Sequence, residues 1–185
     1  MKMRLLRVTL PFVLIGSLAA NEKMVLADLE SMRSGMNWRA VNDGVMGGLS
    51  QGGAAVDESG RLVFEGKISL ENNGGFSSIR SSGREMDLSG FEGIELKVKG
   101  DGRKYYLTAR TKGGWRVAFW SPIQPAKGEW VTVKVPFSDF YATSFGRKLP
   151  GVKFKTDQIT SIGFMLYDKK DGDFHLEVES IGAYK

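Results

Sequence analysis

The sequence contains no cysteine, a single histidine and no run of three or more consecutive lysines and arginines in its 185 residues. The absence of cysteine excludes disulfides, thiolate metal sites and cysteine nucleophiles. The lone histidine, His175, lies in an alternating segment on the same side as Glu177 and Glu179, so we expect it to face water. A histidine-dependent hydrolase is therefore disfavoured, and no G-x-S-x-G motif is present. Without a basic run, nucleic acid is an unexpected partner.

The first twenty residues have the composition of a targeting segment. Lys2, Arg4 and Arg7 precede an apolar run over residues 8–18, and small residues follow at Ala19 and Ala20. Basic start, short apolar middle and small residues are the order of a secretory signal, and the run is shorter than the ~20 residues that span a bilayer. We expect residues 1–20 to be a signal peptide and the protein to be exported to the periplasm or cell envelope. An uncleaved segment, with a cytoplasmic protein, is the alternative.

Removal of this segment changes the charge of the chain. The formal net charge of +5 includes its three basic residues and no acidic one, so residues 21–185 carry +2. Hydrophobic residues make up 42% and charged residues 25%, which is typical of a globular protein. We expect residues 21–185 to form one domain with its own core and no stable membrane span.

Period-two alternation of apolar and polar residues dominates the remaining chain. It is the pattern of strands with one buried face and one face in water. The segments are residues 61–71, 93–100, 130–137, 161–168 and 173–184, and the residues expected in the core are Leu62, Phe64, Ile68, Leu70, Ile94, Leu96, Val98, Val131, Val133, Val135, Ile162, Phe164, Leu166, Phe174, Leu176 and Val178.

Turn residues separate these segments. Asn73-Gly74, Asp101-Gly102, Gly113-Gly114 and Asp171-Gly172 each tolerate positive φ and predict hairpins. Only residues 138–145 and 155–161 offer room for a helical turn. We therefore predict an all-β protein with an antiparallel β-sandwich, jelly-roll fold.

The glycine-rich stretch Val41–Gly53 is the first candidate site. Gly47 and Gly52 have the G-x-x-x-x-G spacing of a phosphate loop, but Gly53-Ala54 stands where lysine and serine or threonine are required. The phosphate interpretation fails, and we expect a tight turn in which Asn42 and Asp43 form side-chain hydrogen bonds.

The acid-rich segment Asp168–Asp173 is a second candidate. Lys170 occupies the third position, where a calcium loop requires an oxygen ligand, so a solvated hairpin turn is the favoured interpretation. Cation binding with another geometry stays open. We expect no cofactor and no metal.

Tryptophans near arginines favour a recognition surface over a catalytic site. Trp115 and Trp120 lie near Arg110 and Arg116, and alternation places one tryptophan on each face, so one of them is exposed or lines a groove. Arg80 and Arg110 project from strands, with Asp43 as a candidate carboxylate partner. A structural salt bridge is the favoured role of these arginines, and recognition of an anion or a sugar is the second.

Four ordered stretches resemble one protein family: "WRAVNDGVMGGLSQG", "FEGKISLENNGGFSSIR", "GDGRKYYLTAR" and "SIGFMLYDKKDGDFHLEVESI". They are similar to blocks of the complex I intermediate-associated protein family, over about residues 24–185. The resemblance implies a galactose-binding-domain-like jelly roll. It also implies a chaperone role in assembling the membrane arm of NADH:ubiquinone oxidoreductase, which is the role of the mitochondrial members. It carries no catalytic residues, and it marks Asn42, Asp43, Asn72, Asn73 and Arg80 as a family-characteristic surface.

Three hypotheses for function follow. The first is a non-enzymatic binding or assembly-factor module with a protein client, linked to the assembly of complex I. The second is a carbohydrate-binding module of the cell envelope, based on Trp115, Trp120 and the galactose-binding resemblance. The third is an enzyme that uses carboxylates such as Asp43.

Overall fold

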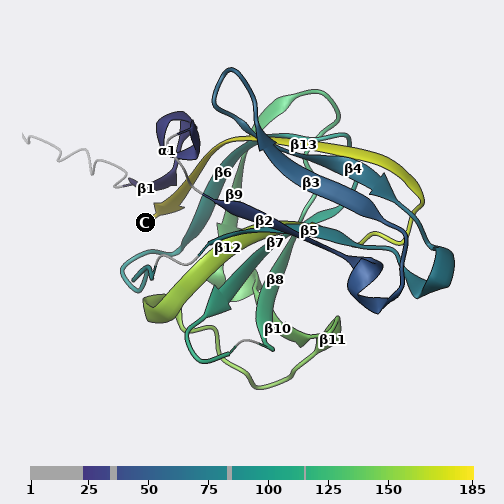
Figure 1. Ribbon diagram of the computed structural model, residues 1–185. Coiled ribbons are helices and arrows are strands. Elements are labelled where there is room, and N and C mark those ends of the chain that lie inside the picture. Colours follow the sequence, from purple (N-terminus) through teal and green to yellow (C-terminus); the bar gives the residue numbers. More distant parts are fainter. Residues whose placement is uncertain (1–22, 34–36, 83–84, 115) are drawn as a thin grey trace, which may run out of the picture.

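The computed structural model describes residues 23–33, 37–82, 85–114 and 116–185. Within these residues, thirteen strands form two antiparallel sheets that pack face to face, and sheet A lies above sheet B in Figure 1. The fold is an all-β sandwich, as the alternation predicted. The expected signal peptide lies outside the described residues.

Sheet A has the strand order β3-β4-β13-β6-β9, and β1 pairs with the C-terminal half of β13. The long strand β13 makes this possible, because its first half pairs with β4 and its second half with β6. The bounds are β1 Lys23–Ala27, β3 Gln51–Val56, β4 Leu62–Ile68, β6 Gly93–Lys99, β9 Trp130–Pro136 and β13 Gly172–Tyr184.

Sheet B has the strand order β11-β10-β8-β7-β12-β5-β2. The bounds are β2 Trp38–Asn42, β5 Ser77–Ser81, β7 Tyr105–Thr111, β8 Ala118–Ile123, β10 Tyr141–Ser144, β11 Arg147–Lys148 and β12 Ile159–Leu166. Central strand β12 pairs with β5 on one side and with β7 on the other. Its outer face therefore brings together residues that are far apart in the sequence.

The core lies between the two sheets and consists largely of the predicted residues. The edge-on rings of Phe64, Tyr105 and Phe174 occupy its centre, with centroids 4.8 to 6.5 Å apart. Burial raises the pKa of the Tyr105 hydroxyl, and the neighbouring Asp101 carboxylate adds to this effect. Thirteen of the predicted core residues are buried: Leu62, Phe64, Ile68, Ile94, Leu96, Val98, Val135, Ile162, Phe164, Leu166, Phe174, Leu176 and Val178.

Three predicted core residues are not fully buried. Val131 and Val133 in β9 are only partly buried against the core, because β9 is an edge strand of sheet A. Leu70 is 38% exposed, because β4 ends at Ile68 and the alternation ends with it.

The four predicted turns are present, but only one closes a hairpin. Gly113-Gly114 joins β7 to β8 within sheet B. The other three connect a strand of one sheet to a strand of the other, from β4 to β5, from β6 to β7 and from β12 to β13. Turn residues specify the local change of direction and not the partner of the next strand, so the hairpin prediction was wrong at these three positions.

Helical structure is confined to short turns in the described residues. The expected helical turns are 3₁₀ turns η3 (Phe137–Asp139) and η4 (Thr156–Gln158), and further short helices are α1 (Leu29–Arg33), η1 (Asp43–Met46) and η2 (Glu71–Asn73). No helix in this part of the chain has the length and apolar character to cross a membrane.

Candidate functional site

The glycine-rich loop that follows β2 is organised around the buried carboxylate of Asp43. This side chain has no exposed surface. Its Oδ1 accepts a hydrogen bond from the Ser50 backbone N–H at 2.9 Å, and its Oδ2 accepts from the N–H groups of Gly75 at 2.6 Å and Phe76 at 3.2 Å. The carboxylate thus ties the stretch "NDGVMGG" to the stretch "NNGGF", some thirty residues later.

The pKa of Asp43 reflects two opposing effects. Burial raises it, but the hydrogen bonds from Ser50, Gly75 and Phe76 together outweigh burial and lower it below its usual value. Asp43 is therefore an ionised structural group. The predicted ion pair with Arg80 or Arg110 was wrong, because both oxygens are directed at backbone N–H groups of the loop.

The surrounding glycines are explained by this carboxylate. A Cβ atom on Gly48 or Gly74 would overlap Asp43, and Gly47 adopts a φ of +87°. Asn42 does not cap η1. Instead, its Nδ2 donates to the Gly52 carbonyl at 3.0 Å and its Oδ1 accepts from the Ser77 hydroxyl at 2.6 Å, so Asn42 connects β3 to β5.

Asn72 and Asn73 lie in η2, shortly before the residues that donate hydrogen bonds to the Asp43 carboxylate. Both have left-handed backbone conformations, with φ of +54° and +59°, and both are exposed. Asparagine tolerates this conformation better than most residues. Their side chains do not line the groove described below, so the structure assigns them a role in the turn.

The acid-rich segment Asp168–Asp173 is a turn held by an arginine. Arg103 donates to both carboxylate oxygens of Asp168, at 2.7 and 3.0 Å, and to the carbonyls of Lys170, Gly172 and Asp173. Arg103 is therefore a positively charged group that contacts these carboxylate and carbonyl oxygens. Hydrogen bonding to Asp168 raises the pKa of Arg103 further.

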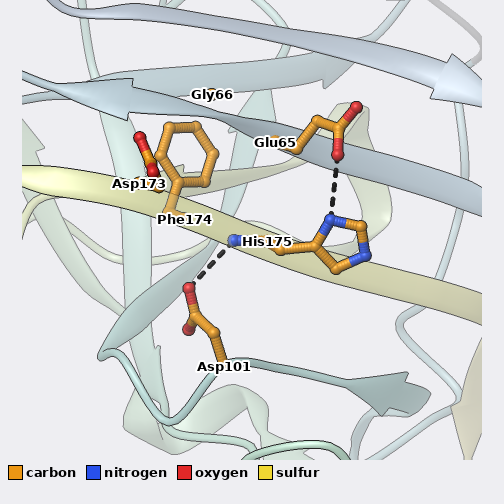
Figure 2. Close-up of a pocket in the computed structure, with 6 residues that line it drawn as sticks. All are labelled: Glu65, Gly66, Asp101, Asp173, Phe174 and His175. Atoms are coloured by element: carbon orange, nitrogen blue, oxygen red, sulfur yellow. Dashed lines mark hydrogen bonds and ion pairs between the residues drawn. The ribbon is translucent and has the colours of Figure 1, made fainter.

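His175 lies on the outer face of sheet A, as predicted. Its side chain is 45% exposed, and Nδ1 lies 2.9 Å from Glu65 Oε2 (Figure 2). The shallow depression beside it is lined by Asp101, whose Oδ2 accepts hydrogen bonds from the His175 backbone N–H and the Tyr105 hydroxyl, both at 2.9 Å. Asp101 thereby connects the loop between β6 and β7 to β13.

The outer face of sheet B carries a groove of about 500 Å³. Alternation in the strands directs the side chains of Ser78 and Arg80 in β5 to this face, and those of Thr108 and Arg110 in β7. The remaining lining comes from Val41, Val45, Met46, Phe76, Ile79, Ala109, Arg116, Ala118, Trp120, Thr143, Phe145, Gly146, Ser161, Met165 and Tyr167. The lining includes three arginines and, among the described residues, no aspartate or glutamate.

The strand register brings the predicted site residues together. Arg80 pairs with Gly163, which pairs with Thr108, which pairs with Trp120, so one row crosses four strands. Gly163 has no alternative here, because a Cβ atom would overlap the Ile79 carbonyl oxygen.

The arginines of the groove lie close to one another. Burial lowers the pKa of Arg80, and the positive charge of Arg39, its direct cross-strand neighbour, adds to this effect. Burial likewise lowers the pKa of Arg110, with a further contribution from Arg80. None of the ion pairs formed among residues 23–33, 37–82, 85–114 and 116–185 includes Arg80. Like charges in directly opposed positions destabilise a sheet.

Trp120 forms the aromatic end of the groove. Its ring lies 5.4 Å from Tyr106 and 6.0 Å from Tyr167, and only 8% of the residue is exposed. Burial raises the pKa of the adjacent Tyr141 to about 12, with the Tyr106 hydroxyl adding to this effect. The expectation that one tryptophan lines a groove agrees with this position, and Trp115 lies outside the described residues.

Apolar side chains stand at the rim of the groove. Val45 and Met46 in η1 are 74% and 61% exposed, and Phe145, in the turn between β10 and β11, is 80% exposed. Phe145 has a φ of +47°, a left-handed conformation that is unusual for an aromatic residue.

The family model of complex I intermediate-associated protein 30 (CIA30) matches residues 27–178. This chain belongs to that family. A Caenorhabditis elegans protein named probable complex I intermediate-associated protein 30, mitochondrial, is 31% identical over 158 residues, which cover 74% of this chain and 46% of that relative. The mouse protein named complex I intermediate-associated protein 30, mitochondrial, is 36% identical over 105 residues, which cover 53% of this chain and 32% of the mouse protein. The aligned part of each relative is thus less than half its length.

Solved structures with a similar fold include carbohydrate-binding modules and an agarase. A family 11 carbohydrate-binding module from Clostridium thermocellum, in complex with a β-1,3-1,4-mixed-linked tetrasaccharide, has a TM-score of 0.64 at 20% identity, covering 89% of this chain and 96% of the module. The agarase AgWH50C has a TM-score of 0.61 at 11% identity, covering 88% of this chain and 24% of the enzyme. At these identities the likeness shows the jelly-roll, galactose-binding-like fold alone.

Sequence reasoning identified the arginines and Trp120 but missed the rim. Val45 and Met46 were treated as part of a glycine-rich turn, and Phe145 as part of a possible helical turn. The one available signal was Gly146, because a two-residue hairpin turn with positive φ at both central residues favours glycine at the second of them, and this places Phe145 at the first.

Proposed function

We propose that this member of the family is a non-enzymatic binding module that takes part in the assembly of respiratory complex I by holding a protein client in the groove of sheet B. The observation that carries the proposal is the rim: Val45, Met46 and Phe145 expose large apolar surfaces around an arginine-lined groove. Apolar side chains that border a groove are typical of protein interaction sites. The names of the relatives support complex I as the setting.

The geometry favours a protein over a neutral glycan. A sugar ring stacks on an open aromatic face, whereas Trp120 is 8% exposed and covered by Tyr106 and Tyr167. The rim combines the aliphatic Val45 and the flexible Met46 with the aromatic Phe145, and this mixture suits the apolar residues of a polypeptide.

A carboxylate enzyme has no support from Asp43. A catalytic carboxyl group must reach its substrate, and this one is fully buried with both oxygens accepting hydrogen bonds.

Complementation tests this proposal. Loss of the protein should lower the amount of assembled complex I on native gels, and wild-type protein should restore it. The variant Met46→Asp, at the rim, should fail to restore it, because a buried charge opposes apolar contact. Val25→Asp is the matched control, since Val25 is 57% exposed on β1 of sheet A. Normal complex I in the absence of the protein, or full rescue by Met46→Asp, would remove the proposal.

We also propose that residues 1–20 direct the protein to an envelope or organellar compartment and are then removed. Their composition supports this, and the relatives are named as mitochondrial. Fractionation with N-terminal sequencing of the mature protein tests it, and a cytoplasmic protein that still begins at Met1 would refute it.

A further inference from the structure

The charged residues of the two sheets are distributed unequally. The strands of sheet A contain five acidic residues, Glu65, Glu95, Asp173, Glu177 and Glu179, and five lysines, Lys23, Lys67, Lys97, Lys99 and Lys134. The strands of sheet B contain no acidic residue and five basic ones, Arg39, Arg80, Arg110, Arg147 and Lys148. All thirteen strands lie within the described residues.

On sheet A the charges neutralise one another. Lys97 in β6 lies 2.7 Å from Glu179 in the neighbouring strand β13, and Lys23 in β1 lies 2.6 Å from Glu95 in β6, across the intervening strand β13. Such pairs satisfy both partners and leave little net field at the surface.

On sheet B the basic groups gather with no acidic residue in the same strands. Arg39 stands directly opposite Arg80, and Lys169 and Lys148 lie over the rings of Tyr167 and Tyr141, at 4.1 and 4.3 Å from the ring centroids. The positive charge therefore extends from the groove onto the aromatic cluster around Trp120. A surface that concentrates one sign of charge attracts ligands of the opposite sign.

From this distribution, and building on the function proposed above, we infer that the groove binds an acidic, apolar segment of the client polypeptide, with a carboxylate held by Arg80 and Arg110 and apolar side chains against Val45, Met46 and Phe145. Arginine suits this task because its planar guanidinium forms paired hydrogen bonds with a carboxylate. A bound carboxylate would also relieve the repulsion between Arg39 and Arg80. The groove volume of about 500 Å³ accommodates a few side chains rather than a whole folded surface.

Selection from a library of short random peptides on the full-length protein tests this inference. The most enriched peptide is then synthesised twice, once as selected and once with each Asp and Glu replaced by Asn and Gln. We expect the selected peptides to combine acidic with apolar residues, and the amide version to bind about tenfold more weakly. Binding of the acidic version should weaken as salt is added.

Two variants of equal charge change locate the site. Arg80→Gln should weaken binding of the acidic peptide about tenfold, whereas Lys67→Gln, which removes a positive charge from the opposite face, should leave it unchanged. Arg80→Gln should fold with a melting temperature equal to or above that of the wild type, since it removes a repulsion. A lower melting temperature together with unchanged peptide affinity would show a structural role for Arg80 and overturn the inference.

Other outcomes separate this inference from the proposed function. If the selected peptides carry no acidic residue but Met46→Asp abolishes their binding, the carboxylate inference fails and the protein-binding function stands. If no peptide is enriched, the carboxylate inference and the protein-binding function both fail. Binding to mixed-linked glucan oligosaccharides, or to phosphatidylcholine vesicles containing phosphatidylglycerol, then shows whether the ligand is a glycan or a lipid surface.

Discussion

The substitution Asp43→Asn probes the buried carboxylate that joins the two glycine-rich stretches. The asparagine amide has the same shape but only one oxygen. If that oxygen faces Gly75 and Phe76, the new NH₂ group faces the Ser50 N–H, so one buried donor loses its acceptor. The two remaining hydrogen bonds lose the assistance of the negative charge. Together these losses should lower the free energy of unfolding by about 3 kcal/mol.

This loss should be visible in both thermal and chemical unfolding. For a domain of this size, 1 kcal/mol corresponds to about 2–4 °C, so the melting temperature should fall by about 6–12 °C. Asp171→Asn is the control, because Asp171 is exposed and uses one oxygen to accept the Leu70 N–H at 2.8 Å, which an amide oxygen can replace. Its effect should stay below about 1 kcal/mol.

The pH dependence provides an independent test of the same group. The hydrogen bonds lower the pKa of Asp43 in the folded state despite burial. Its ionised form therefore stabilises the fold at pH values above the unfolded pKa of about 4, and this stabilisation is lost as the pH falls through the folded pKa. The difference between wild type and Asp43→Asn in urea unfolding should be constant near neutral pH and should narrow in acid. Equal stability at neutral pH, or a difference that widens in acid, would refute this role of Asp43.

Three further substitutions test other parts of the structure. Phe145→Asn should raise the free energy of unfolding by about 0.5–1 kcal/mol, because asparagine tolerates the positive φ at this position. The same substitution should weaken client binding, because it removes an apolar side chain from the rim of the groove. Lower stability with unchanged binding would contradict both the strain at Phe145 and its role in binding. Arg103→Lys should lower the free energy of unfolding in urea by about 1–3 kcal/mol, because lysine cannot replace the paired hydrogen bonds to Asp168. An unchanged urea midpoint would show that these hydrogen bonds do not stabilise the fold. Gly163→Ala should lower stability by about 2 kcal/mol, because its Cβ meets backbone, whereas Gly53→Ala, where a Cβ meets no atom within 4 Å, should be neutral; equal effects would count against the packing at Gly163.

The fold was predictable because alternation is a local signal. Segments such as Gly93–Lys99 place apolar residues on one face, and the structure buries Ile94, Leu96 and Val98 as expected. The pairing of strands was not predictable from the same signal. The turn at Asn73-Gly74 has the composition of a hairpin, yet it connects the two sheets. The partners of β4 are β3, directly before it, and β13, about one hundred residues later, whereas β5 lies in the other sheet.

The candidate site was predictable only in part, for a similar reason. Arg80 and Arg110 were predicted to project from strands, and one of Trp115 and Trp120 was predicted to be exposed or to line a groove. The groove that Arg80, Arg110 and Trp120 share depends on β12 lying between β5 and β7. The partners of Asp43 could not be derived, because Gly75 is a backbone donor and leaves no signature of its own. The charge difference between the sheets becomes visible only after each strand has been assigned to a sheet.

Site-specific photo-crosslinking in the cell tests most directly whether the groove holds a protein client. A photoreactive residue is placed at position 145, at the rim of the groove, or at position 67, on the outer face of sheet A, and adducts are identified by mass spectrometry. We expect position 145 to yield a defined protein adduct that contains a complex I subunit, and position 67 to yield none. Equal adducts from both positions, or adducts from position 67 alone, would contradict binding through the groove.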